Sequence, residues 1–197
     1  MPKISAATVA EHRAMKERQV IAAAVELLTT EGASAVTPAA VAERAGLART
    51  SVYQYARSGN DLAALAVEEI FLQVNASLTA ALDAAGPEPA ARLEAIIRTI
   101  LQGAVDGHAP DQALDVAALG AAQQERLRQL HQDLVAPLSA TIAGVAGVGS
   151  GDVAMLTAIS WGAINGVVPL IEHGLPVDRA VPMVVAYVRA GTEAAAR

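Results

Sequence analysis

The sequence contains no cysteine, and this absence excludes several kinds of site at once. Without cysteine the chain has no disulfide framework, no thiolate metal site and no cysteine nucleophile. No uninterrupted apolar run reaches about eighteen residues, the length that a membrane span needs. The N-terminal stretch also lacks the apolar core of a signal peptide. We therefore expect a cytoplasmic protein that makes no use of a membrane.

Alternating strand patterns are missing as well. Alanine, the best helix former, occurs throughout, and valine recurs mostly at helical spacing. The sequence predicts an all-α fold, with an N-terminal three-helix domain in residues 1–60 and a six-helix domain in residues 61–197. The expected helices run from Thr8 to Gly32, from Pro38 to Gly46, from about Arg49 to Ala56, from about 61 to 86, and over about 88–105, 111–120, 121–143 (bent or broken near Pro137), 152–173 and 178–195.

Catalytic patterns are also lacking. The four histidines are scattered, with no pair spaced for metal binding on one helix face (His12, His108, His131 and His173). The glycine-rich stretch GVAGVGSGD joins two predicted helices, which indicates a linker and not a phosphate loop. We expect no enzyme activity, no metal and no cofactor, with an all-α enzyme kept as an alternative.

Charge is sparse and unevenly distributed. Residues 1–60 carry seven Lys or Arg against five Glu, a net charge of +2, whereas the remainder carries seven against fifteen acidic residues, a net charge of −8. A mildly basic N-terminal part on an acidic chain is typical of a polyanion-binding domain joined to a regulatory one.

Aromatic residues make up only 3% of the chain, yet two of its three tyrosines lie in AGLARTSVYQYARSG, residues 45–59. Ala42 and Gly46 allow two short helices to cross with a tight turn, and Leu47 and Val52 fill the space between them. This spacing predicts a helix-turn-helix whose second helix enters the DNA major groove. The residues that point outward have the side chains that read bases or bond phosphates: Arg49, Thr50, Ser51, Gln54 and Tyr55. An ordinary αα-corner with a solvated outer face is the alternative.

Residues 18–65 resemble the N-terminal domain of the TetR family of bacterial transcriptional regulators. The landmarks follow the family order: Gly32, Thr37, Val41-Ala42, Ala45-Gly46-Leu47 and Tyr53. The resemblance implies a homodimer that binds double-stranded DNA at a palindromic operator and is released by a small-molecule effector. It adds Thr37, Tyr53 and Arg57 to the expected DNA-binding residues.

Three positions depart from the family pattern. Ala48 replaces a helix-capping Ser, Ala56 replaces a Phe in the core, and Gly59 replaces a Lys that would approach phosphate. We expect Arg57 to take over the lost phosphate contact.

Two further sets of residues follow from the resemblance. In the family the last two helices form the dimer interface, which here predicts the residues Gly162, Gly166, Val181, Val184, Val185 and Val188. The alternative is that these residues belong to the core. Polar and aromatic residues within apolar helices are the candidates for the effector site: Phe71, Asn75, Gln102, Gln124, His131, Trp161 and Asn165. Each of them also fits a packing or surface role, and for Trp161 we favour packing.

The sequence therefore predicts a ligand-responsive transcriptional repressor. The scarcity of Lys and Arg beyond residue 60 favours an apolar or neutral effector. A DNA-binding protein without a ligand switch remains an alternative.

Overall fold

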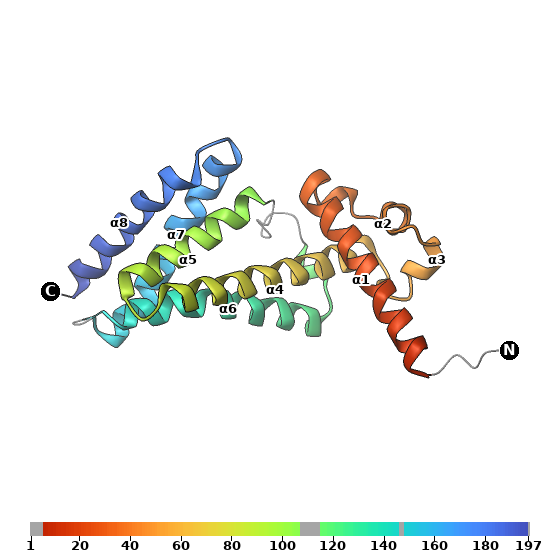
Figure 1. The fold of residues 1–197 in the computed structure, drawn as a ribbon, viewed down its shortest axis with the longest axis horizontal. Helices are drawn as coiled ribbons and strands as arrows, with labels where there is room; N and C mark the ends of the chain where they lie inside the picture. Colours follow the sequence, from red (N-terminus) through yellow and green to blue (C-terminus); the bar gives the residue numbers. More distant parts are fainter. Residues whose placement is uncertain (1–5, 107–114, 146–147, 197) are drawn as a thin grey trace. The chain divides into compact units, whose positions relative to one another are not determined.

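The computed structural model describes residues 6–106, 115–145 and 148–196. Within these ranges it contains helices and no strand, which confirms the predicted all-α fold (Figure 1). The elements are α1 (Ala6–Glu31), η1 (Ala33–Ala35), α2 (Pro38–Ala45), α3 (Arg49–Val52), α4 (Gly59–Ala85), α5 (Pro89–Val105), η3 (Val116–Ala118), α6 (Ala121–Ala143), α7 (Ser150–Glu172) and α8 (Val177–Ala195).

The chain folds into two compact units. The head unit comprises Met1–Ile70 and Pro110–Leu127, and the body unit comprises Phe71–Ala109 and Arg128–Arg197. The division therefore differs from the predicted boundary at residue 60. The physical reason is that α4 and α6 are each continuous through the change from one unit to the other, so neither is interrupted by a linker there.

Local sequence explains the helices of the head unit. The Thr37 hydroxyl accepts a hydrogen bond from the Ala40 backbone N–H at 3.1 Å, and Pro38 occupies the first helical position of α2. Gly46 ends α2 in the left-handed conformation, at φ 66°. The Leu47 backbone N–H then donates to the Ala42 carbonyl at 2.9 Å, which closes the turn before α3.

An apolar cluster from α1 to α4 holds the head unit together. Its largest buried members are aliphatic, and small side chains fill the space between them: Val20, Ala24, Leu27, Val36, Val41, Ala42, Val52, Ala56 and Leu62. On the surface, Arg44 of α2 bridges to α1 by ion pairs of 2.6 Å to Glu26 and 2.8 Å to Glu31. The hydrogen bond from Arg44 to Glu31, with the charge of Glu26, raises the pKa of the Arg44 guanidinium.

In the body unit, α5 packs against α7 and α8, which also pack against each other. The largest fully buried side chains of this unit are Leu78, Ile96, Ile97, Leu101, Leu138, Ile164 and Val181. Pro137 lies within α6, which nevertheless runs as one helix and is not broken there. The Thr141 hydroxyl, one turn later, donates to the Pro137 carbonyl at 2.8 Å.

Several element boundaries differ from those expected, most of them by one or two residues. Helix α1 begins at Ala6 and not at Thr8, and α3 ends at Val52, where a turn replaces the expected continuation to Ala56. Part of the helix expected over 111–120 lies outside the described residues, which hold only the 3₁₀ turn η3 there. Residues 146–147 of the GVAGVGSGD stretch also lie outside them.

Two helices are long and apolar enough to cross a membrane: Gly59–Ala85 in α4 and Gly151–Glu172 in α7. Polar residues interrupt both of them, so no continuous apolar run marks these helices in the sequence. Length and composition alone are weak evidence, because core helices of soluble proteins meet the same criterion. Only 28% of the apolar window of α7 is buried, so much of this helix faces solvent in a single chain.

Candidate functional site

The α2–turn–α3 segment presents a compact polar surface on the head unit. Val52 is completely buried and anchors α3 in the core. Four side chains around it are exposed, and Ser51 is half-buried; the exposed ones are Arg49, Thr50, Tyr53 and Gln54. Helix α3 therefore has one face in the core and an outer face of hydrogen-bonding groups, as a helix that reads DNA requires.

Arg49 and Tyr53 form a pair on this surface. The Arg49 Nη2 donates to the Tyr53 hydroxyl at 3.1 Å, and the guanidinium carbon lies 5.8 Å from the centre of the Tyr53 ring. The tyrosine oxygen accepts this hydrogen bond, so its own O–H stays available as a donor. The pair thus combines a positively charged fork with a free hydroxyl donor.

Tyr55 does not belong to the outer face, contrary to the expectation from the sequence. Its ring packs against the apolar core of the head unit, and its hydroxyl donates to the Arg13 carbonyl of α1 at 3.4 Å. The reason is helical spacing: Tyr55 lies three residues after the buried Val52, so its side chain falls on the same side of the segment, and the Ala56 backbone N–H still donates to the Val52 carbonyl at 3.2 Å.

Thr37 and Arg57 lie at the ends of this segment. Thr37 is exposed, and its hydroxyl oxygen is used as the cap of α2. The Arg57 side chain is 92% exposed, with its Nε 3.9 Å from the Asp61 carboxylate, a distance that leaves it free to reorient. Ser58 caps the start of α4, since its hydroxyl accepts a hydrogen bond from the Asp61 backbone N–H at 3.0 Å.

The three departures from the family pattern have different structural meanings. Ala48 precedes α3 with no side-chain cap, as expected. Ala56 is 5% exposed and belongs to the head core. Gly59 has a structural role of its own in addition to removing the lysine, because a Cβ at this position would lie 2.5 Å from the Val36 carbonyl oxygen. The start of α4 approaches the segment before α2 so closely that only glycine fits.

The structure brings some of the candidate effector residues together in the body unit. His131 of α6 makes edge-to-face contacts with Phe71 of α4, at 6.2 Å between ring centres, and with Trp161 of α7, at 5.3 Å. Beside them, the Asn75 amide donates to the Leu130 carbonyl at 3.3 Å and the Asn165 amide to the Trp161 carbonyl at 3.0 Å. These five residues form what we call the aromatic cluster: Phe71, Asn75, His131, Trp161 and Asn165.

The other two candidates lie elsewhere. Gln124 is in the head unit, where its amide donates to the Leu119 carbonyl at 2.9 Å. Gln102 lines a polar hollow of about 390 Å³ between α4 and α5. Arg98 also lines this hollow, and its hydrogen bonds to Asp178 at 2.6 Å and Glu94 at 3.1 Å raise its pKa. Sequence reasoning missed Arg98, because its closer partner lies 80 residues further along the chain.

The predicted dimer residues divide into two groups. Gly162 and Gly166 are exposed on α7, whereas Val181, Val184 and Val188 are at most 5% exposed and pack in the core of the body unit. The valine stripe of α8 is therefore not available to a partner, and Val185 is only half-buried. The exposed large apolar side chains of these helices are Met155, Ile159, Leu170, Met183 and Tyr187.

Comparisons with known proteins agree with the geometry of the head unit. Residues 20–66 match the family model described as bacterial regulatory proteins, tetR family. No curated protein matches the chain by sequence.

Solved structures share the fold over most of the chain. The fatty acid degradation regulator FadR from Bacillus halodurans has a TM-score of 0.70 at 16% identity, covering 88% of this chain and 94% of that one. FadR from Bacillus subtilis, in complex with stearoyl-CoA, has a TM-score of 0.69 at 17% identity, covering 87% and 96%. A TetR-like transcriptional regulator from Rhodococcus sp. RHA1 has a TM-score of 0.70 at 20% identity, covering 90% and 96%.

Proposed function

We propose that this chain, whose residues 20–66 match the model of the tetR family of bacterial regulatory proteins, is a ligand-responsive transcriptional repressor of that family. It binds a palindromic operator as a homodimer and leaves the operator when a small molecule binds. The observation that carries this proposal is the α2–turn–α3 segment, with Val52 in the core and Arg49, Tyr53 and Gln54 on the outer face. Such a regulator works in the cytoplasm, where its operator is.

The side chains of the outer face have distinct tasks in this proposal. Arg49 and Gln54 contact base edges. An arginine can donate to two acceptors on one base, and a glutamine amide can bind an acceptor and a donor on one base. Thr50, Ser51 and the free hydroxyl donor of Tyr53 bind phosphate oxygens, as does Arg57 at the end of the segment. Thr37 places the N-terminus of α2 and adds a phosphate contact there.

The homodimer is supported by the exposed stripe of α7. Met155, Ile159, Gly162 and Gly166 follow one another at helical spacing on the solvent side of this helix. Glycine at two of the four positions allows a partner helix to approach closely. The proposed two-fold dimer forms through α7 and the exposed Met183 and Tyr187 of α8. To read a palindrome, its two recognition helices must reach half-sites about 34–36 Å apart, one turn of DNA.

The effector site is proposed at the aromatic cluster. A ligand that inserts between the rings of Phe71, His131 and Trp161 would separate α4, α6 and α7. Because α4 and α6 continue into the head unit, this separation favours a head position that no longer fits the operator. Within the head unit, the ion pair from Arg126 of α6 to Glu68 of α4, 2.8 Å long, ties the two helices together.

The cluster combines aromatic rings with two amides and contains no Lys, Arg, Asp or Glu, so the proposed effector is apolar or neutral. One structural neighbour was solved with stearoyl-CoA, a ligand with a long apolar chain. Because the CoA part of that ligand is strongly anionic, neutral long-chain acyl esters and neutral aromatic compounds are the first effectors to assay, with stearoyl-CoA as the anionic comparison.

The experiment that tests the proposal is selection of bound duplexes from a random pool by the purified protein, at near-physiological salt, where non-specific binding is weak. We expect an inverted repeat to be recovered. Recovery of a single half-site would refute the dimer, and recovery of no preferred sequence by folded protein would refute sequence-specific DNA binding.

A DNA-binding protein without a ligand switch is the second candidate, favoured by the contacts that the aromatic cluster already makes within itself. Thermal unfolding with and without a panel of apolar compounds separates the two. A compound that raises the melting temperature and weakens operator binding supports the switch, whereas an unresponsive protein supports the second candidate.

A further inference from the structure

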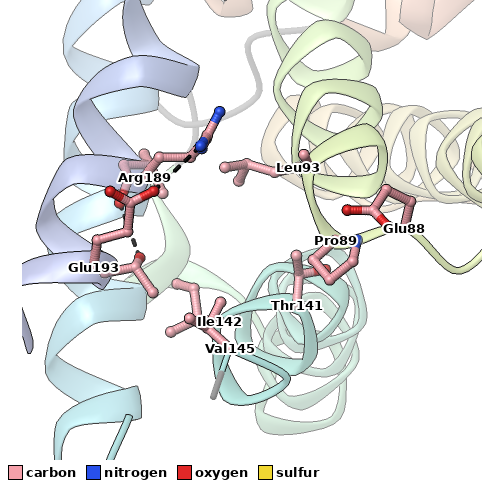
Figure 2. A pocket seen from close by; sticks show the side chains of 11 residues that line it. Glu88, Pro89, Leu93, Thr141, Ile142, Val145, Arg189 and Glu193 are labelled. Atoms are coloured by element: carbon pink, nitrogen blue, oxygen red, sulfur yellow. Dashed lines mark hydrogen bonds and ion pairs between the residues drawn. The ribbon is translucent and has the colours of Figure 1, made fainter. Parts of the chain in front are cut away.

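A hollow of about 160 Å³ lies in the body unit, and none of the aromatic cluster residues lines it. Three helix ends form it: the beginning of α5, the end of α6 and the last turns of α8 (Figure 2). Its rim is open to solvent, because Glu88, Pro89, Arg189 and Glu193 are exposed. None of the residues predicted for DNA, dimer or effector binding lines it except Val188.

The floor of the hollow is apolar. Leu93, Ile142 and Val188 are each at most 5% exposed, and their side chains close it from below. The hydroxyls of Thr141 and Thr192 donate to the carbonyls of their own helices, at 2.8 and 2.9 Å, so neither offers a free donor to the hollow. A cavity of about 150 Å³ is known to hold benzene. The floor therefore fits one aromatic ring or a branched aliphatic group.

The rim carries an excess of negative charge. Arg189 pairs with Glu193 at 3.2 Å on the α8 side, so these two charges compensate each other. Glu88, on the α5 side, has no side-chain cap hydrogen bond, and no ion pair involves it within the described part of the chain. Figure 2 shows its carboxylate at the edge of the hollow, across from Arg189 and Glu193. One uncompensated carboxylate beside an apolar floor is complementary to a cation with an apolar body.

We propose that this hollow binds a small primary amine about the size of benzylamine. The ring rests on Leu93, Ile142 and Val188, and the ammonium group donates to the Glu88 carboxylate. A carboxylate ligand would meet Arg189 only at the expense of its pair with Glu193, and would face Glu88 as well. This site does not depend on the proposed DNA binding.

The test is a ligand-observed NMR titration of the full chain with three probes of one shape: benzylamine, benzyl alcohol and benzoate. At neutral pH and constant ionic strength, we expect benzylamine to bind about fivefold more tightly than benzyl alcohol, the factor that an exposed ion pair of about 1 kcal/mol supplies. Benzoate should bind most weakly. Equal affinities for the three probes, or preference for benzoate, would overturn the proposal.

Two variants locate the site. Glu88→Gln should lower benzylamine affinity to that of benzyl alcohol and leave benzyl alcohol unaffected, whereas Glu172→Gln removes the same charge from α7 and should change neither. Val145→Phe fills the hollow and should abolish binding of both probes, with circular dichroism to verify folding. An unchanged benzylamine affinity in Glu88→Gln, or any benzylamine binding in folded Val145→Phe, would place the amine elsewhere and refute the assignment.

Discussion

Tyr53 and Tyr55 lie two residues apart, yet their hydroxyl groups face different partners. Tyr53 accepts from Arg49 on the outer face, while Tyr55 donates to the Arg13 carbonyl of α1. We expect Tyr53→Phe to weaken binding to operator and random DNA about equally, by about 1–2 kcal/mol, because a phosphate contact carries no sequence information. Tyr55→Phe is the matched control, and its DNA affinity in fluorescence anisotropy should equal that of the parent. A larger loss of DNA affinity for Tyr55→Phe than for Tyr53→Phe would show that Tyr55 contacts DNA.

Gln54 is the residue with which we test base recognition. Its side chain is exposed and directly follows Tyr53. We expect Gln54→Ala to lower operator affinity by about 1–3 kcal/mol, to leave random DNA unaffected and to relax preference at one base pair of each half-site. Competition binding against operators substituted at single positions measures this. Uniform weakening on every duplex would show that Gln54 contacts phosphate instead.

Ala48 offers a gain in stability. The first turn of α3 has no side-chain cap. Because serine at an N-cap accepts a backbone N–H, Ala48→Ser should raise the free energy of unfolding by about 0.5–2 kcal/mol, measured by urea denaturation. Ala76→Ser, at an exposed position inside α4, is the control and should give no gain. If both serines have the same effect, the cap is not the cause.

At the scale of elements, the contact between the start of α4 and the segment before α2 depends on Gly59. A Cβ there would lie 2.5 Å from the Val36 carbonyl oxygen, and backbone cannot yield as a flexible side chain does. We expect Gly59→Ala to destabilise the protein by about 1–3 kcal/mol, the usual range for overpacking. Thermal and urea unfolding measure this loss.

Gly191→Ala is the matched control for that substitution. Gly191 lies in α8, where an added Cβ would meet no atom within 4 Å, so alanine should stabilise the helix. The expected gain is up to about 1 kcal/mol, the difference in helix propensity between the two residues. A Gly59→Ala variant as stable as the parent would mean that the α4 start moves away from Val36 without loss.

Helices were predictable where local sequence determines them. Thr37 and Pro38 specify the start of α2, and Gly46 its end, because capping and left-handed turns depend on residues that are neighbours in sequence. The end of α3 was not predictable in the same way. Nothing in its local sequence marks the turn that follows Val52. Tyr55 was assigned to the wrong face for a different reason: it lies three residues after Val52, so helical spacing itself places its side chain on the core side.

Contacts between residues that are distant in the chain could not be predicted from the sequence. The close approach of Gly59 to Val36 and the pairing of Arg98 with Asp178 join residues that are 23 and 80 positions apart. For α8, helical spacing identified a valine stripe but could not tell whether it faces the core or a partner. The structure shows Val184 and its neighbours in the core, with Met183 and Tyr187 on the solvent side.

At the scale of the whole molecule, the exposed stripe of α7 gives the proposed homodimer a sharp test. Ile159 is 49% exposed in the single chain, so an aspartate there would disturb the monomer little and place buried charge in the dimer. We expect Ile159→Asp to sediment as a monomer at concentrations where the parent is a dimer. Leu72→Asp, on α4 at 41% exposure, is the control and should remain a dimer.

The same variant links assembly to DNA reading. Two linked recognition helices bind a palindrome more tightly than one because the second contact is intramolecular, an advantage of about 10²–10⁴. Ile159→Asp should therefore lose at least about a hundredfold in affinity for the inverted repeat while its affinity for a single half-site stays unchanged. If the monomeric variant bound the inverted repeat as tightly as the parent, DNA recognition would not require the dimer. If Ile159→Asp stayed dimeric, the dimer interface would lie on another face, and the exposed stripe of α7 would not be part of it.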